Sequence, residues 1–166
     1  MWARIALASS VLLLAAPAVG EEVPQLRPGA EHAVPLYGEV VRVFDAPEDP
    51  FAAGHRGVDV AAPTGSPVRS SAPGVVSFAG SVAGNLTVTV DHGGGLLTTY
   101  SFLGSTSVAR GTAVERGHVV GTVGRGHVGS SLPPHVHLSA RRDGFYFDPI
   151  ELYLGDAYSD LLSLVG

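Results

Sequence analysis

Residues 86–90 read Leu-Thr-Val-Thr-Val, a run in which apolar side chains alternate with threonines. A period of two indicates a β-strand with one buried face, and β-branched residues favour that conformation. Comparable runs recur roughly every ten residues, a spacing typical of β-sandwiches and barrels. They cover residues 40–44, 74–79, 96–103, 118–123 and 136–141. We therefore predict an all-β fold, a single compact antiparallel β-sheet domain of sandwich or barrel-like form.

The composition also favours short strands joined by turns. Of the 166 residues, 22 are glycine and 12 are proline, above the usual shares of about 7% and 5%. Charged residues make up only 15% of the chain and the hydrophobic classes 45%, which excludes a disordered polyelectrolyte. Helix is expected only in a short tail, at residues 149–154 and 159–164.

The first 20 residues have the pattern of a secretory signal peptide. Arg4 precedes an apolar run over residues 5–16, and small residues then offer cleavage after Ala18 or Gly20. The run is too short for a comfortable membrane span. We expect cleavage, which leaves a secreted, extracytoplasmic protein of the cell wall or periplasm without a membrane span. The alternative is a retained N-terminal anchor.

The rest of the chain is expected to hold one domain. Residues 21–34 are polar, contain proline and lack periodicity, which predicts a linker or arm. Residues 35–154 carry the strand-like runs and form the predicted β domain, and residues 155–166 form a C-terminal tail. We expect this domain to be a monomer.

Charge and cysteine content exclude several functions. The ten positive charges are all arginine, and the formal net charge of −5 leaves no basic surface for nucleic acid. The chain has no cysteine, so it has neither disulfides nor thiolate metal ligands. A Gly-x-Gly-x-x-Gly match at residues 124–129 is not followed by a helix pattern, which argues against dinucleotide binding.

Histidines are the remaining candidates for chemistry. His55 and Asp59 lie four residues apart with glycines around them, so both side chains can converge on one point. His135 and His137 alternate on a predicted strand, which places their imidazoles on one face about 7 Å apart. Two histidines and one carboxylate with an open fourth position make a catalytic zinc site. The alternative is a set of surface or packed histidines.

Five stretches then carry a resemblance. They read GHRGVDVAAPTGSPV at residues 54–68, APGVVSFAG at 72–80, DHGGGLLTTYSFL at 91–103, GTAVERGHVVGTVGRGH at 111–127 and PPHVHLSARRDGFYFDP at 133–149. In this order they resemble the lysostaphin/LytM-type zinc endopeptidases of bacterial cell walls, over residues 37–154. The resemblance implies a compact antiparallel β domain with the duplicated hybrid motif fold. It also implies one bound zinc ion and cleavage of peptide bonds in peptidoglycan.

Residue by residue, the resemblance implies that His55, Asp59 and His137 bind the zinc. It implies that His135 is a catalytic histidine beside the metal.

One position departs from the family's pattern. Its Tyr-x-His-Leu stretch is Tyr100-Ser101-Phe102-Leu103 here, so Phe102 replaces a second catalytic histidine. Strand alternation predicts Tyr100 and Phe102 on one face, where both are candidates for the wall of a substrate groove. Tyr100 is equally compatible with a place in the core. A phenyl ring cannot take up a proton, so turnover is in doubt although the ligand positions remain.

Three functions stay open. The first is a zinc endopeptidase acting on peptidoglycan peptides. The second is a catalytically silent, zinc-containing module that binds the wall or regulates partner wall hydrolases. The third is a metal-free adhesion domain. The other histidines, which are expected at turns or in structural positions, are His32, His92, His118 and His127. Arg56 is either a surface residue or a partner for a substrate carboxylate.

Overall fold

The computed structural model describes residues 31–47, 49, 52–127 and 129–154. The predicted signal peptide, most of the arm, the tail and the helix at residues 159–164 lie outside the described residues. Within the described part, no helix is long and apolar enough to cross a membrane.

The described residues form ten strands and one short helix. They are β1 (Glu39–Arg42), β2 (Val58–Ala61), β3 (Pro67–Arg69), β4 (Gly74–Val82), β5 (Asn85–Asp91), β6 (Leu96–Thr106), β7 (Ala113–Val114), β8 (Val119–Val123), β9 (His135–Arg142), β10 (Phe145–Phe147) and α1 (Ile150–Leu154). All strands join one antiparallel sheet in the order β1-β2-β9-β6-β5-β4-β7. β10 pairs with β9, and β8 connects β3 to β6. The predicted all-β fold is confirmed, with a sheet that is not closed into a barrel.

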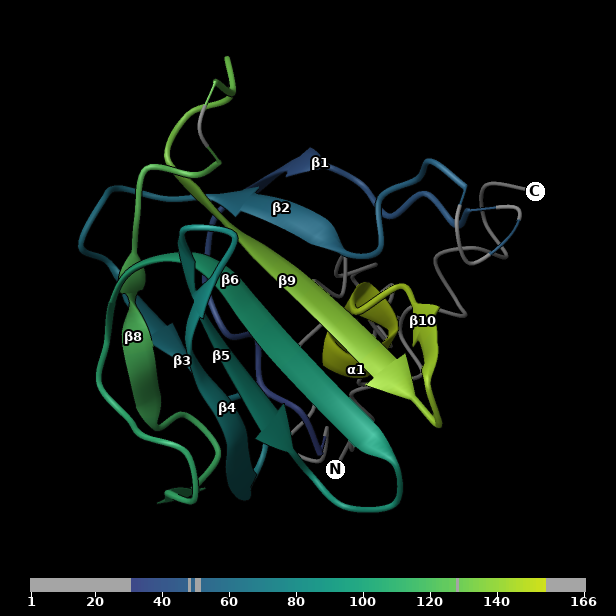
Figure 1. Cartoon of the computed structure of the whole chain (residues 1–166), viewed down its shortest axis with the longest axis vertical. Coiled ribbons are helices and arrows are strands. Elements are labelled where there is room, and N and C mark those ends of the chain that lie inside the picture. Colours follow the sequence, from purple (N-terminus) through teal and green to yellow (C-terminus); the bar gives the residue numbers. More distant parts are fainter. Residues whose placement is uncertain (1–30, 48, 50–51, 128, 155–166) are drawn as a thin grey trace, which may run out of the picture.

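Six of the strands coincide with runs identified in the sequence. β1, β4, β5, β6, β8 and β9 overlap these runs, and α1 overlaps the helix expected at residues 149–154. In Figure 1 the long strands β6 and β9 lie side by side across the middle of the sheet. Sequence periodicity did not reveal β2, β3, β7 or β10, which have two to four residues each.

The core is built mainly from valines. On β5 the side chains of Val88 and Val90 are fully buried, while Thr89 between them is only partly buried. This is the alternation predicted for residues 86–90, and burying each valine contributes about 1.5–3 kcal/mol. The buried apolar cluster comprises Leu36, Val58, Val60, Val68, Val76, Val88, Val90, Tyr100, Leu103, Val114, Val120, Val123, Val136, Leu138 and Tyr153.

His32 anchors residues 31–34, the part of the predicted arm that the structure describes. Its Nδ1 lies 3.0 Å from the Ser71 hydroxyl, and its ring packs edge-on against His92. The Nδ1 atom of His92 donates to the Pro73 carbonyl, and its Nε2 atom pairs with the Thr98 hydroxyl. Burial lowers the pKa of both imidazoles, so the neutral forms suit this packing.

Candidate active site

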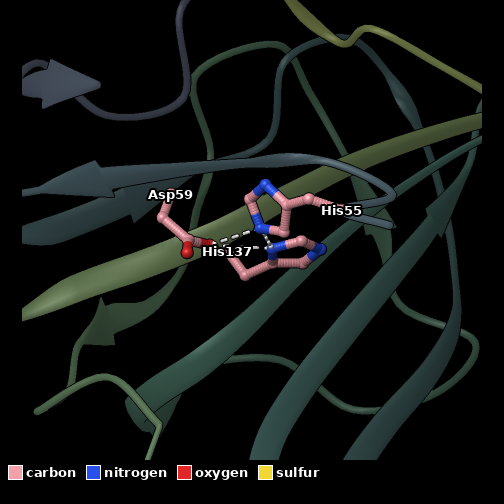
Figure 2. Close-up of side chains that lie close together, drawn as sticks. All are labelled: His55, Asp59 and His137. Atoms are coloured by element: carbon pink, nitrogen blue, oxygen red, sulfur yellow. Dashed lines mark hydrogen bonds and ion pairs between the residues drawn. The ribbon is translucent and has the colours of Figure 1, made fainter. Parts of the chain in front are cut away.

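His55, Asp59 and His137 meet at one point, as Figure 2 shows. Asp59 lies on β2 directly opposite His137 on β9, and its Oδ1 atom is 2.8 Å from the Nδ1 atom of His137. The Nε2 atom of His55 lies 3.1 Å from each of these two atoms. Two imidazoles and one carboxylate therefore offer three ligand atoms to a single point.

Two local features bring His55 into this cluster. Its backbone pairs with that of Asp45 through two hydrogen bonds of 2.8 and 2.9 Å. Gly57 then lets the chain pass close to β9. A Cβ atom at position 57 would fall 2.7 Å from Nε2 of His137 and closer still to the Leu138 carbonyl. The glycine therefore allows β2 and β9 to pair beside the site.

A hydrogen bond on its outer side orients the His55 ring for binding a cation. His55 Nδ1 lies 2.7 Å from the Val43 carbonyl, which can only accept, so this nitrogen carries the proton. With Nδ1 donating to Val43, Nε2 is the nitrogen that faces Asp59 and His137. Such an outer hydrogen bond is the usual way in which a protein orients a metal-binding histidine.

Asp59 remains ionised in this setting. Burial acts to raise its pKa, but the hydrogen bond from His137 and the charges of the three neighbouring imidazoles outweigh burial. The pKa of Asp59 is therefore lower than usual. A buried carboxylate needs a positive or hydrogen-bonding partner, and a bound cation would supply one at this point. The donor set of two histidines and one carboxylate fits zinc with a fourth position open.

His135 lies two residues before His137 on β9 and is fully buried. Its Nδ1 atom is 2.7 Å from the Pro133 carbonyl and therefore donates to it, which leaves a lone pair on Nε2. Nε2 is buried and has no hydrogen-bond partner among the described residues. Leaving such an atom unpaired costs about 1–3 kcal/mol, so it is a candidate for handling a proton.

Phe102 lies beside these histidines. The centroid of its ring is 5.6 Å from that of His135 and 6.1 Å from that of His137. Its backbone is left-handed, with a φ of 64°, a conformation that is uncommon for a bulky residue. It occupies a bulge, because Leu103 pairs with Leu86 while Ser101 already pairs with Thr87.

Because of this bulge, the prediction that Tyr100 and Phe102 share one face of the strand is wrong. Tyr100 continues the buried face of Leu96 and Thr98 and is 0% exposed, while the extra residue turns Phe102 to the opposite face. Its hydroxyl accepts from the Ser71 amide at 2.9 Å and pairs with Thr98. Tyr100 therefore belongs to the core and has no surface to offer to a groove.

His127 was expected to be a turn residue, yet the structure brings it to the site. Its ring centroid lies 5.6 Å from those of both Phe102 and His135. It belongs to the segment after β8, in which Gly126 also lies against the His135 ring. Neither spacing nor periodicity in the sequence indicates that approach.

Comparison with known proteins agrees with this geometry. The model of peptidase family M23 matches residues 53–149. A DD-carboxypeptidase/endopeptidase of Neisseria meningitidis, Mpg, is 42% identical over 101 residues, which are 60% of this chain and 23% of Mpg. The peptidoglycan DD-endopeptidase ShyA of Vibrio cholerae is 38% identical over 85 residues, 50% of this chain and 19% of ShyA. The chain thus spans less than a quarter of the length of either relative.

A solved structure also shares the fold. The catalytic domain of lysostaphin from Staphylococcus simulans superposes with a TM-score of 0.58 at 22% identity. The match covers 68% of this chain and 90% of the lysostaphin domain.

Gly126 offers a test of how His135 is held. Its φ is +82°, and an added Cβ would fall 2.6 Å from Nδ1 and 2.9 Å from Nε2 of His135. Gly129 has a nearly equal φ of +81° but open space around it, so Gly129→Ala reports the backbone strain alone. That strain is about 1–2 kcal/mol. We expect Gly126→Ala to lower the free energy of unfolding, measured in urea, by more than Gly129→Ala does. Equal losses would show that the His135 ring is not packed against this loop.

Proposed function

Because this chain belongs to peptidase family M23, we propose that it is a secreted zinc endopeptidase that cleaves peptide bonds of bacterial cell-wall peptidoglycan. The observation that carries the proposal is the convergence of His55, Asp59 and His137 beside the unpaired Nε2 atom of His135. The names of Mpg and ShyA, which describe endopeptidases, support the same class of reaction. The signal-like residues 1–20 support an extracytoplasmic location.

In this proposal His55, Asp59 and His137 hold one zinc ion. When bound, zinc would polarise a peptide carbonyl and lower the pKa of a water molecule. His135 then acts as the base: its Nε2 accepts a proton as water attacks the carbonyl carbon. The same nitrogen returns the proton to the amine that leaves when the carbon–nitrogen bond breaks. The carbonyl of Pro133 keeps Nδ1 protonated, so that Nε2 is the nitrogen that exchanges the proton.

Phe102 favours a second candidate function. The phenyl ring lies near His127, His135 and His137 but can neither donate a hydrogen bond nor carry a proton. A zinc-containing module that binds the wall or regulates partner hydrolases would tolerate this loss. The retained ligand set and the preserved His135 favour the peptidase.

Zinc binding is the first prediction of this proposal. The purified protein should contain about one zinc ion per chain by atomic emission, and His55→Ala or His137→Ala should remove it. Because zinc binds the folded state, a chelator should lower the melting temperature of the parent. His118→Ala is the matched control, since His118 is exposed and lies outside the site. Full zinc content in both ligand variants would contradict the assignment.

The second prediction concerns His135. His135→Ala should keep its zinc and lose about 10²–10⁴-fold in the rate of peptide release from purified peptidoglycan. The change removes a proton carrier without removing a proposed ligand. His118→Ala should digest the wall at the parental rate. A His135→Ala protein that is as active as the parent would leave this histidine with a packing role only.

The third prediction separates the two candidate functions. Phe102→His should raise wall digestion about 10–10³-fold, because it adds a proton carrier at a position where histidine tolerates a left-handed backbone. Phe102→Asn is the matched control, since asparagine also tolerates that backbone but does not exchange protons. Zinc content and melting temperature are measured for each variant. If the parent and both variants are folded and zinc-loaded yet release no peptide, the binding module replaces the peptidase.

A further inference from the structure

A groove runs across the sheet from the metal-site residue His137. Its volume is about 370 Å³, and it lies over β4, β5, β6 and β9. Of the cluster formed by His55, Asp59 and His137, only His137 is among the described residues that line the groove. The groove therefore begins at the site and leads away from it.

Hydroxyl groups form the floor of this groove. Thr89, Thr99 and Ser139 are directly opposite one another on β5, β6 and β9, as are Thr87, Ser101 and His137. The threonines at 89 and 99 are hydrogen-bonded at 3.0 Å, and Thr87 donates to Ser101 at 3.2 Å. These rows offer donors and acceptors to the backbone of a polar, extended chain.

Partly exposed apolar side chains form the walls. Phe78 and Val82 on β4 lie on one side and are 38% and 53% exposed. Tyr146 on β10 lies on the other side and is 43% exposed. A hydroxyl floor between apolar walls suits a peptide that passes through the groove in an extended form.

The charge of the groove is one-sided. Arg56 and Arg141 line it, and the described lining residues include neither aspartate nor glutamate. This is notable in a chain whose formal net charge is −5. Positive charge in this groove attracts an anionic group on the ligand.

Arg141 is the better placed of the two arginines. His135, His137, Ser139 and Arg141 alternate along β9 and so share one face. At the rise of a β-strand, Arg141 stands about 13 Å beyond His137. Its guanidinium carbon lies 5.9 Å from the centre of the Tyr146 ring, which restrains the side chain at the wall of the groove.

We propose that Arg141 binds a free carboxylate of the peptide that occupies this groove, so the site selects acidic wall peptides over neutral ones. A guanidinium pairs with a carboxylate through two parallel hydrogen bonds, which gives both affinity and register. The ligand class rests on the proposed function, because that function supplies the peptide. The inference itself concerns binding and does not require cleavage.

The test compares two forms of one ligand. Soluble peptides released from peptidoglycan are used as prepared, or after their carboxyl groups have been activated with a carbodiimide and amidated with excess ammonium. Calorimetry should show that the parent protein binds the acidic form about 10–100-fold more tightly, the range expected for a charge-assisted hydrogen bond. Arg141→Gln should abolish this preference while leaving the affinity for the amidated form unchanged.

Arg142 provides the matched control. It follows Arg141 on β9, also packs on an aromatic ring of β10, and lines a different pocket beside His32 and His92. Arg142→Gln removes the same charge from the opposite face and should keep the preference. A second measurement needs no variant: added salt should weaken parental binding of the acidic peptides much more than that of the amidated ones.

The outcomes separate this inference from the proposed function. Three results would overturn the role of Arg141. The parent could bind the two peptide forms equally, or Arg141→Gln and Arg142→Gln could lose the preference equally. Arg141→Gln could also lose affinity for both peptide forms. An Arg141-dependent preference in a protein that never cleaves the wall would support the groove and refute the peptidase. Cleavage without any preference for the acidic form would refute the groove assignment alone.

Discussion

The antiparallel pairing of β2 with β9 places Asp59 directly opposite His137, and the site depends on this register. A shift of one residue would turn one of these side chains to the other face of the sheet. The register is held by Val58, Val60, Val136 and Leu138, which are buried on the core face of the same two strands. Core packing and the placement of Asp59 and His137 are therefore specified by the same eight paired residues, four on each strand.

Periodicity predicted the parts of the fold in which one face is buried and the other is not. β5 shows this clearly, because its valines face the core and its threonines face the groove. β2 has only four residues, too few for a periodic pattern to stand out. Its polar residue, Asp59, does not mark a solvent face either, because it is as fully buried as the valines beside it. The buried carboxylate of Asp59 serves the site and not the packing of the core, so hydrophobic pattern alone could not predict β2.

The arrangement at Phe102 could not be predicted from alternation. A period of two assumes that each residue of β6 has a partner on β5, and the bulge adds one residue without a partner. This single insertion leaves Tyr100 on the core face and turns Phe102 to the opposite face, toward the histidines. His127 was missed for a related reason. Its position depends on the path of a glycine-containing loop, which neither residue spacing nor hydrophobic pattern determines.

The site is maintained at a cost to stability. It includes an unpaired imidazole nitrogen and a phenylalanine in left-handed backbone, each unfavourable by roughly 1–3 kcal/mol. These costs fall near β9 and its neighbours β2 and β6, strands that also carry buried core residues such as Val58, Val136 and Leu138. Rigid packing there offsets the strain and keeps the ligand atoms close together. The hydroxyl-lined groove lies on the face of β6 and β9 opposite the valine core, the face that also carries His137, so one sheet supplies both the stability and the chemistry.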